Sequence, residues 1–110
     1  MDKLYLIVRE DLDPCQQAVQ AAHALAQFFV DYPQQAVSWA KGSNTLALLA
    51  ASGEPELRAL VEKAEGKDHK VSPFYEPDRG NEMTAIALEP KAKTLVRKYP
   101  LALKMTSPSW

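Results

Sequence analysis

The feature that most constrains the fold is the apolar run from Leu4 to Val8, because five consecutive apolar or aromatic side chains cannot all face water. A strand built from such a run presents apolar residues on both faces, so it has to be covered from both sides. Asp13 and Pro14 follow shortly afterwards. Asp can cap a helix and proline fits the first helical position. The start of the chain therefore predicts a buried strand followed directly by a helix.

The same patterns predict the other elements and, from their order, the fold class. The βαβ portion calls for a parallel pair of strands with a right-handed crossover, and the last two strands form an antiparallel hairpin. Helices cover both faces of the sheet, so we expect one α/β domain over residues 1–110, a three-layer α/β/α sandwich with a four-stranded mixed sheet. The expected strands are Lys3–Arg9, Thr45–Ala51, Val71–Tyr75 and Met83–Leu88, and the expected helices are 15–31, 34–41, about 55–64 and 90–99.

The first helix has two stripes at helical spacing, one apolar and one polar. We expect the apolar stripe to pack on the sheet, and it consists of Val19, Ala22, Ala26, Phe29 and Val30. The polar stripe consists of Gln16, Gln20, His23 and Gln27. Three of these four are amides, whereas a solvent-facing helix usually carries charges there. The stripe therefore indicates a surface that hydrogen-bonds a ligand, and His23 can exchange protons near neutral pH.

A second candidate region is the loop Glu76–Asn81, which holds two carboxylates, a guanidinium and an amide between two strands. Loops at strand ends are where open α/β sheets place ligands. An ordinary hairpin turn has the same composition, so both interpretations stay open. Thr84 follows on the next strand, where threonine is also common for its β-propensity alone.

Composition narrows the class of protein. Apolar residues form 46% of the chain and charged residues 25%, which excludes a disordered or fibrous protein. The single cysteine, Cys15, excludes a disulfide framework and a Cys-based zinc cage, and His23 and His69 lack a metal-ligand spacing. No apolar run approaches the roughly 18–20 residues that span a bilayer, and no signal peptide is visible. We therefore expect a cytoplasmic protein without metal, cofactor or membrane contact.

The net charge of −1 does not indicate nucleic acid, but the charges are unevenly distributed. The segment 81–110 has only two acids, and its five cations are Lys91, Lys93, Arg97, Lys98 and Lys104. One interpretation is a solvated last helix and the other is an edge of the molecule that faces an anion.

Three stretches of the chain together resemble the type II peptidyl-tRNA hydrolase family. They are LYLIVREDL at 4–12 with AVQAAHA at 18–24, TLALLAASGEPELRALVEKAE at 45–65, and FYEPDRGNEMTAIALEP at 74–90. The first is similar to the family's "R-x-D-L" and "A-A-Q-x-x-H-A" motifs, and the third to its closing loop and last strand. The likeness covers roughly residues 3–104.

This resemblance implies a fold, an activity and a set of site residues. The family has a four-stranded mixed sheet between helices, hydrolyses the ester that joins a peptide to the 3′ end of tRNA, and is often a homodimer. The implied catalytic residues are His23, Thr84 and an acid, which falls on Asp78 or Glu76. If the chain is such a hydrolase, we expect Gln16 and Gln20 to hold the substrate and the cations Arg79, Lys91 and Arg97 to meet tRNA phosphates.

One departure from the family pattern opens an alternative function. The family carries a glycine-lysine pair four residues before the glutamine, where this chain has Cys15 and Gln16. Loss of one stabilising cation or donor costs about 10²–10³ in rate. The alternative is a catalytically impaired member that binds tRNA or a protein. A third possibility is a homodimeric interaction protein whose aromatic residues Phe28, Phe29, Trp39 and Trp110 lie partly at the interface.

Overall fold

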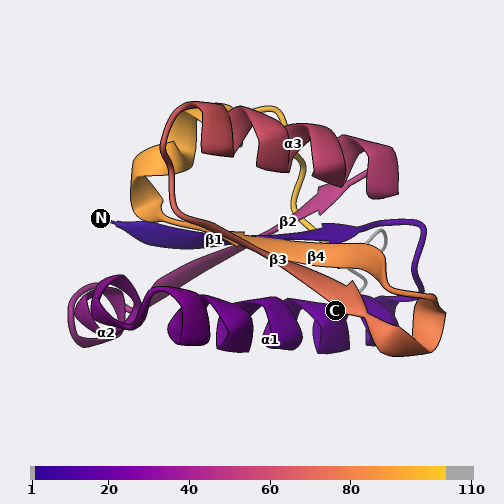
Figure 1. The fold of residues 1–110 in the computed structure, drawn as a ribbon, viewed down its shortest axis with the longest axis horizontal. Coiled ribbons are helices and arrows are strands. Elements are labelled where there is room, and N and C mark those ends of the chain that lie inside the picture. Colours follow the sequence, from indigo (N-terminus) through magenta and orange to yellow (C-terminus); the bar gives the residue numbers. More distant parts are fainter. Residues whose placement is uncertain (1, 104–110) are drawn as a thin grey trace, which may run out of the picture.

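The first strand is buried on both faces, as its sequence predicts. The computed structural model describes residues 2–103, and strand β1 (Lys3–Arg9) lies inside a sheet with helices on either side (Figure 1). Leu4, Leu6 and Val8 point to one apolar cluster, and Ile7 points to a second cluster on the opposite face. This alternation divides the core into two layers and confirms the three-layer α/β/α sandwich.

The sheet has four strands in the order β2-β1-β4-β3, which confirms the mixed topology. Strand β2 (Thr45–Ala51) pairs parallel with β1, whereas β4 (Glu82–Leu88) is antiparallel to β1 and to β3 (Val71–Glu76). A short 3₁₀ turn, η1 (Pro77–Arg79), joins β3 to β4. Because β4 is antiparallel to β1, the start of β4, and with it the β3–β4 connection, lies at the same end of the sheet as the end of β1.

Helices α1 (Pro14–Asp31) and α2 (Pro33–Lys41) cover one face of the sheet, and α3 (Glu54–Gly66) covers the other (Figure 1). Asp13 caps α1 by accepting a hydrogen bond of 2.9 Å from the Gln16 N–H, as expected. The predicted inner face of α3 is also confirmed, since its buried residues are Leu57, Leu60, Val61 and Ala64.

The predicted apolar stripe of α1 is wrong. Val30 is 74% exposed and Val19 42% exposed, and Ala22 and Ala26 also face outward. Phe29 is half-buried. The residues that face the sheet are Gln17, Gln20, Ala21, Ala24 and Phe28.

Two buried amides explain this rotation of the helix. The Gln17 Nε2 group donates to the Leu12 carbonyl oxygen at 2.7 Å, and the Gln20 side chain is fully hydrogen-bonded inside the protein. Internal hydrogen bonds replace those to water, so glutamine can occupy the inner face while alanine and valine lie outside.

The prediction that four aromatic residues lie partly at a homodimer interface is wrong for two of them. Phe28 is fully buried and Trp39 is 8% exposed. The Phe29 ring packs against Trp39 with 6.4 Å between the centroids, and Trp110 lies outside the described residues. Phe28 and Trp39 are thus part of the apolar core beneath α1 and α2, and Phe29 packs against it.

The predicted helix from Pro90 to Tyr99 is also wrong, because only a 3₁₀ segment, η2 (Pro90–Leu95), forms there. The chain then runs beside β2, where the Ala50 N–H donates to the Pro100 carbonyl oxygen and the Ala102 N–H donates to the Leu48 carbonyl oxygen, both at 2.9 Å. A helix continuing to Tyr99 would leave this edge of the sheet unpaired, whereas the extended segment covers part of it.

The burial of α1 gives a direct test of its corrected orientation. Phe28→Ala should lower the free energy of unfolding by about 3–5 kcal/mol, because it leaves a cavity in the layer beneath the helix. Urea denaturation monitored by circular dichroism measures this change. Val30→Ala, on the same helix, should change stability by less than about 0.5 kcal/mol. Similar losses for the two variants would contradict the orientation.

Candidate functional site

A fully buried glutamine connects three elements at the end of the sheet where β1 ends. The Gln20 Nε2 group of α1 donates to Glu76 Oε1 at 2.9 Å and to Gln16 Oε1 at 3.3 Å. Its Oε1 atom accepts a hydrogen bond of 2.7 Å from the Thr84 hydroxyl on β4. Gln20 and Thr84 have no exposed surface, while Gln16 and Glu76 are half-buried. The cluster therefore reaches the surface through Glu76 and Gln16.

A register shift between β3 and β4 brings Thr84 into this cluster. Phe74 pairs with Ala85 but the next residue, Tyr75, pairs with Met83, so Thr84 has no residue opposite it. The extra residue alters the strict alternation of side chains, and Thr84 faces α1 on the same side as Ala85. Bulges commonly redirect a side chain next to functional sites. Here the shift is what allows a strand threonine to meet a helix amide.

The acceptor-only chemistry of a carboxylate sets the direction of these hydrogen bonds. An ionised Glu76 can only accept, so the Nε2 group of Gln20 must face it and the Oε1 atom must face Thr84. The Thr84 hydroxyl is then the donor to Gln20. Each hydrogen bond polarises the next, which strengthens a buried chain of this kind. The result is a carboxylate at the surface with one oxygen bound to the buried amide.

His23 lies on the surface beside this chain, one helical turn after Gln20. Its ring stacks face to face on Phe74 of β3, with centroids 4.5 Å apart and an angle of 6° between the planes. The residue is exposed. The Gln20–Glu76 hydrogen bond places the polar side of α1 against the acidic end of β3.

A buried arginine that the sequence interpretation did not select supports the same corner. Arg9, at the end of β1, is 7% exposed and contacts both oxygens of Asp11, at 3.0 and 2.8 Å. It also donates to Glu82 at 2.7 Å and to the Met83 carbonyl oxygen at 3.3 Å. The N–H of Met83 donates to Glu54 at 2.7 Å. The peptide groups on both sides of Met83 are thus fixed directly before Thr84.

These contacts shift the pKa values of two carboxyl groups. Hydrogen bonds from the Arg9 guanidinium hold the pKa of Asp11 below its ordinary value. The backbone N–H of Met83, with Arg58, similarly lowers the pKa of Glu54. Hydrogen bonds and opposite charge favour the ionised form of both groups. The signal for this cluster in the sequence is an arginine that directly follows a buried apolar run.

The other predicted site residues lie apart from the Gln20 cluster. Asp78 is on η1, is exposed, and makes no side-chain hydrogen bond or ion pair within residues 2–103. Arg79 lies 3.6 Å from Glu82. Lys91 and Arg97 line two surface hollows at the opposite end of the sheet. The structure therefore brings together Gln16, Gln20, Glu76 and Thr84, with His23 beside them.

Within the described part of the chain, no group of three or more His, Cys, Asp or Glu residues is arranged to hold a metal ion. The same residues contain no helix long and apolar enough to cross a membrane. The candidate site thus consists of amide, hydroxyl, carboxylate and imidazole groups.

The fold and this site define a class, a small α/β sandwich with a buried amide-carboxylate chain at one end of a four-stranded mixed sheet. Residues 2–106 match the family model described as peptidyl-tRNA hydrolase PTH2, which is nearly the whole chain. The protein belongs to this family, and the match confirms the resemblance seen in the sequence.

Comparison with solved structures supports the fold. The structure of a protein of unknown function from Agrobacterium tumefaciens strain C58 matches with a TM-score of 0.65 and 15% sequence identity, over 90% of this chain and 96% of that one. No curated protein gives a significant match to the sequence.

The buried chain can be tested by a double-mutant cycle. Gln20→Met leaves the Thr84 hydroxyl without its acceptor, so it should lower the free energy of unfolding by about 1–3 kcal/mol. Thr84→Val should also destabilise the protein, and the double variant should lose less than the sum of the two single changes. Urea denaturation measures all four proteins. Gln27→Met, which removes a surface hydrogen bond to Asp31, is the control, and additive losses at Gln20 and Thr84 would argue against the coupling.

The lowered pKa of Asp11 predicts a pH dependence. Asp11→Asn should lower stability by about 1 kcal/mol at neutral pH, a value discounted for the partial exposure of the carboxyl group. Because the folded pKa lies below the unfolded value, the stabilisation is full above the unfolded pKa and is lost as the pH falls through the folded one. The difference from wild type should therefore close below about pH 4. Thermal unfolding of wild type and variant from pH 7 to pH 2 checks this. The control is Asp78→Asn, whose difference in stability from wild type should not change over this pH range.

Proposed function

We propose that this protein hydrolyses the ester bond between the peptide and the 3′-terminal ribose of peptidyl-tRNA, which releases tRNA for reuse. Membership of the PTH2 family supports this reaction class. The observation that carries the proposal is the Glu76 carboxylate, which the buried Gln20 amide holds at the surface beside an exposed imidazole. The proposed reaction requires no metal or cofactor.

In the proposed mechanism Glu76 orients a water molecule against the ester carbonyl and accepts its proton. The water oxygen forms a bond to the carbonyl carbon, and the carbonyl π electrons move to oxygen, giving a tetrahedral oxyanion. When the oxyanion collapses, the bond to the ribose oxygen breaks and that oxygen takes up the proton. Positioning of water and stabilisation of the oxyanion supply most of the acceleration in this chemistry.

The other members of the cluster have different roles in this proposal. Gln20 and Thr84 are fully buried, so they act through Glu76 as positioning residues. His23 and Gln16 reach the surface and would hydrogen-bond the substrate carbonyl or the terminal ribose. His23 is also a second candidate for the proton-accepting group. Between the two acids that the sequence left open, the contact with Gln20 favours Glu76 over Asp78.

Glu76, the last residue of β3, and Asp78, two residues later in η1, give a matched test of the activity. Glu76→Gln should lower the rate of peptide release from peptidyl-tRNA by about 10²–10⁴, because it removes the base and keeps the shape of the side chain. Asp78→Asn, in the same connection, should stay within about twofold of wild type. Acid gel electrophoresis of labelled peptidyl-tRNA measures release. The proposal fails if wild type releases no peptide at micromolar enzyme, and the assignment to Glu76 fails if only Asp78→Asn is inactive.

Further variants in the same assay separate positioning from folding. Thr84→Val should lower kcat more than it raises KM, because the hydroxyl orients Gln20 and not the substrate. Thr84→Ser keeps the hydroxyl and should restore kcat, which a purely structural role would not require. His23→Ala should reduce release if the imidazole contacts the reacting ester.

One observation favours a second function, that of a family member that binds tRNA or a protein with little or no turnover. The four hydrogen-bonded residues of the cluster include no cation, and Gln16 stands where the family pattern has lysine. Binding of tRNA without ester release would support this alternative. Gln16→Lys should then gain activity, since an ammonium group would meet the developing oxyanion.

The proposed activity also carries expectations about partners and location. A substrate made during translation implies a cytoplasmic protein that binds tRNA. The homodimer implied by the family stays a prediction, which size-exclusion chromatography with light scattering would test.

A further inference from the structure

The cations near the candidate site are occupied by acids. Arg9 is paired with Asp11 and Glu82, and Arg58 is paired with Glu54 at 3.0 Å. Arg79 also lies within ion-pair distance of Glu82. Glu76 and Asp78 add further negative charge at this end of the sheet. These three arginines are therefore not free to bind a polyanionic substrate, although the reacting end of such a substrate would have to enter the candidate site.

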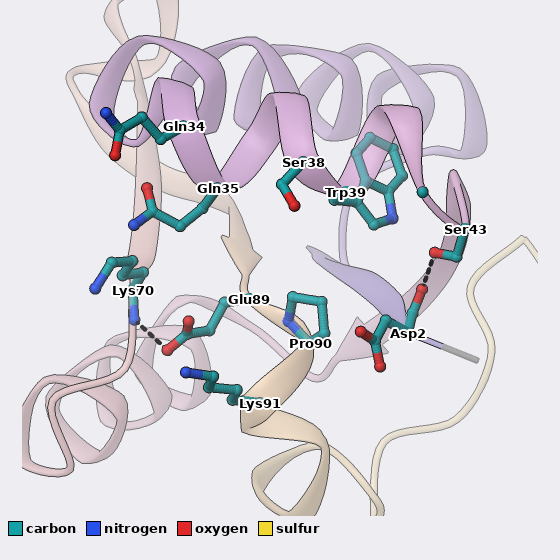
Figure 2. Close-up of a pocket in the computed structure, with 11 residues that line it drawn as sticks. Asp2, Gln34, Gln35, Ser38, Trp39, Ser43, Lys70, Glu89, Pro90 and Lys91 are labelled. Carbon is teal, nitrogen blue, oxygen red and sulfur yellow. Dashed lines mark hydrogen bonds between the residues drawn. The ribbon is translucent and has the colours of Figure 1, made fainter.

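The opposite end of the sheet carries cations that make no ion pair within residues 2–103. Two hollows lie there on either side of η2. The first, of about 540 Å³, lies between α2 and the end of β4, and Figure 2 shows the side chains of Lys70 and Lys91 on its wall opposite Gln34 and Gln35. The second, of about 340 Å³, is on the other side of η2. Its basic residues are Lys3, Lys93 and Arg97.

The acids of these hollows do not cancel this charge. Among the lining residues only Asp2 and Glu89 are acidic, against five cations. Glu89 is 7% exposed, and its Oε2 atom accepts a hydrogen bond of 2.9 Å from the Lys70 backbone N–H and lies 3.2 Å from His69 Nδ1. This carboxylate is thus directed to the protein, whereas the lysine and arginine side chains are at the surface. The second hollow has no acidic lining residue.

We propose that this end of the molecule, named here the η2 surface and formed by Lys3, Lys70, Lys91, Lys93 and Arg97, binds the phosphate backbone of RNA. The inference rests on the proposed function and adds to it a division of labour. Chemistry takes place at the acidic end of the sheet, and affinity comes from the basic end. Lysine and arginine that neutralise phosphates release counterions, which makes such binding depend steeply on salt.

The distance between the two ends corresponds to a short stretch of stacked RNA. Glu89 directly follows β4 and is five residues from Thr84, which corresponds to about 17 Å along the strand. A stacked strand advances about 3.4 Å per nucleotide, so the η2 surface would meet phosphates about five nucleotides from the esterified ribose.

A continuous line of contacts between α1 and the edge strand β3 connects the site with the first hollow. Ser72, Phe74 and Glu76 of β3 all contact α1, so that a seam between the two elements runs along the strand. Tyr32, at the end of α1, is followed immediately by α2, which forms one wall of the first hollow. In order from the site, the pairs along the seam are Gln20–Glu76, His23–Phe74, Asp31–Ser72, Tyr32–Val71 and Tyr32–Lys70.

The test compares RNA binding with turnover of a substrate too short to reach the η2 surface. Lys91→Gln combined with Arg97→Gln removes one cation from each hollow. Filter binding of uncharged tRNA should weaken about tenfold, and the slope of log affinity against log salt should fall by about 1.4–1.8. Hydrolysis of a peptide esterified to adenosine alone should stay within about twofold of wild type.

The control is Lys63→Gln combined with Lys67→Gln, two exposed lysines at the end of α3 that line neither hollow. This variant loses the same charge and should bind tRNA like wild type. Equal weakening in both double variants would overturn the inference, as would wild-type protein that binds anionic lipid vesicles but not tRNA. If wild type hydrolyses neither ester but binds tRNA through Lys91 and Arg97, the η2 surface is supported and the proposed activity fails separately.

Discussion

The architecture of this corner depends on one buried amide. Gln20 has no exposed surface, so its burial is tolerable only because its N–H and carbonyl groups both find partners inside the protein. Those partners come from β3 and β4, which fixes the rotation of α1 against the sheet. The same requirement holds Glu76 in place at the surface. A contact that contributes to folding is therefore also the one that prepares the candidate reactive group.

Arg9, at the end of β1, stabilises the same end of the sheet through other contacts. Its contacts with Asp11 fix the chain that leads into α1, and its contacts with Glu82 and Met83 fix the start of β4. Because the guanidinium is buried, these acids are needed to neutralise it, and it is no longer free for a ligand. This explains why the candidate site is acidic although it contains arginines. In the proposal, recognition of a polyanion is therefore left to the η2 surface, whose cations make no ion pair within residues 2–103.

Much of the fold could be predicted from the sequence, because continuous apolar strands and helix starts are local signals. Lys3–Arg9 and Thr45–Ala51 have the predicted bounds, and Asp13 caps the helix as expected. The face of α1 could not be predicted, since single alanine and valine residues are tolerated on an exposed helix surface while the burial of Gln20 depends on partners far along the chain. The role of Thr84 depends on a register shift between two strands, which local pattern does not contain. Linear order also says nothing about which end of the sheet Lys91 and Arg97 reach, so their separation from the Gln20 cluster could not be predicted.

The residue at position 16 shows why family membership and fold do not fix the level of activity. Gln16 is in the first turn of α1, where the helix dipole disfavours a cation and the Asp13 cap already satisfies its backbone N–H. Lysine at this position would gain little from folding, so its replacement by glutamine costs the fold little. The amide also joins the buried chain by accepting a hydrogen bond from Gln20. Selection for stability alone would therefore retain Gln16 as readily as lysine, and only the proposed chemistry at the ester would distinguish the two.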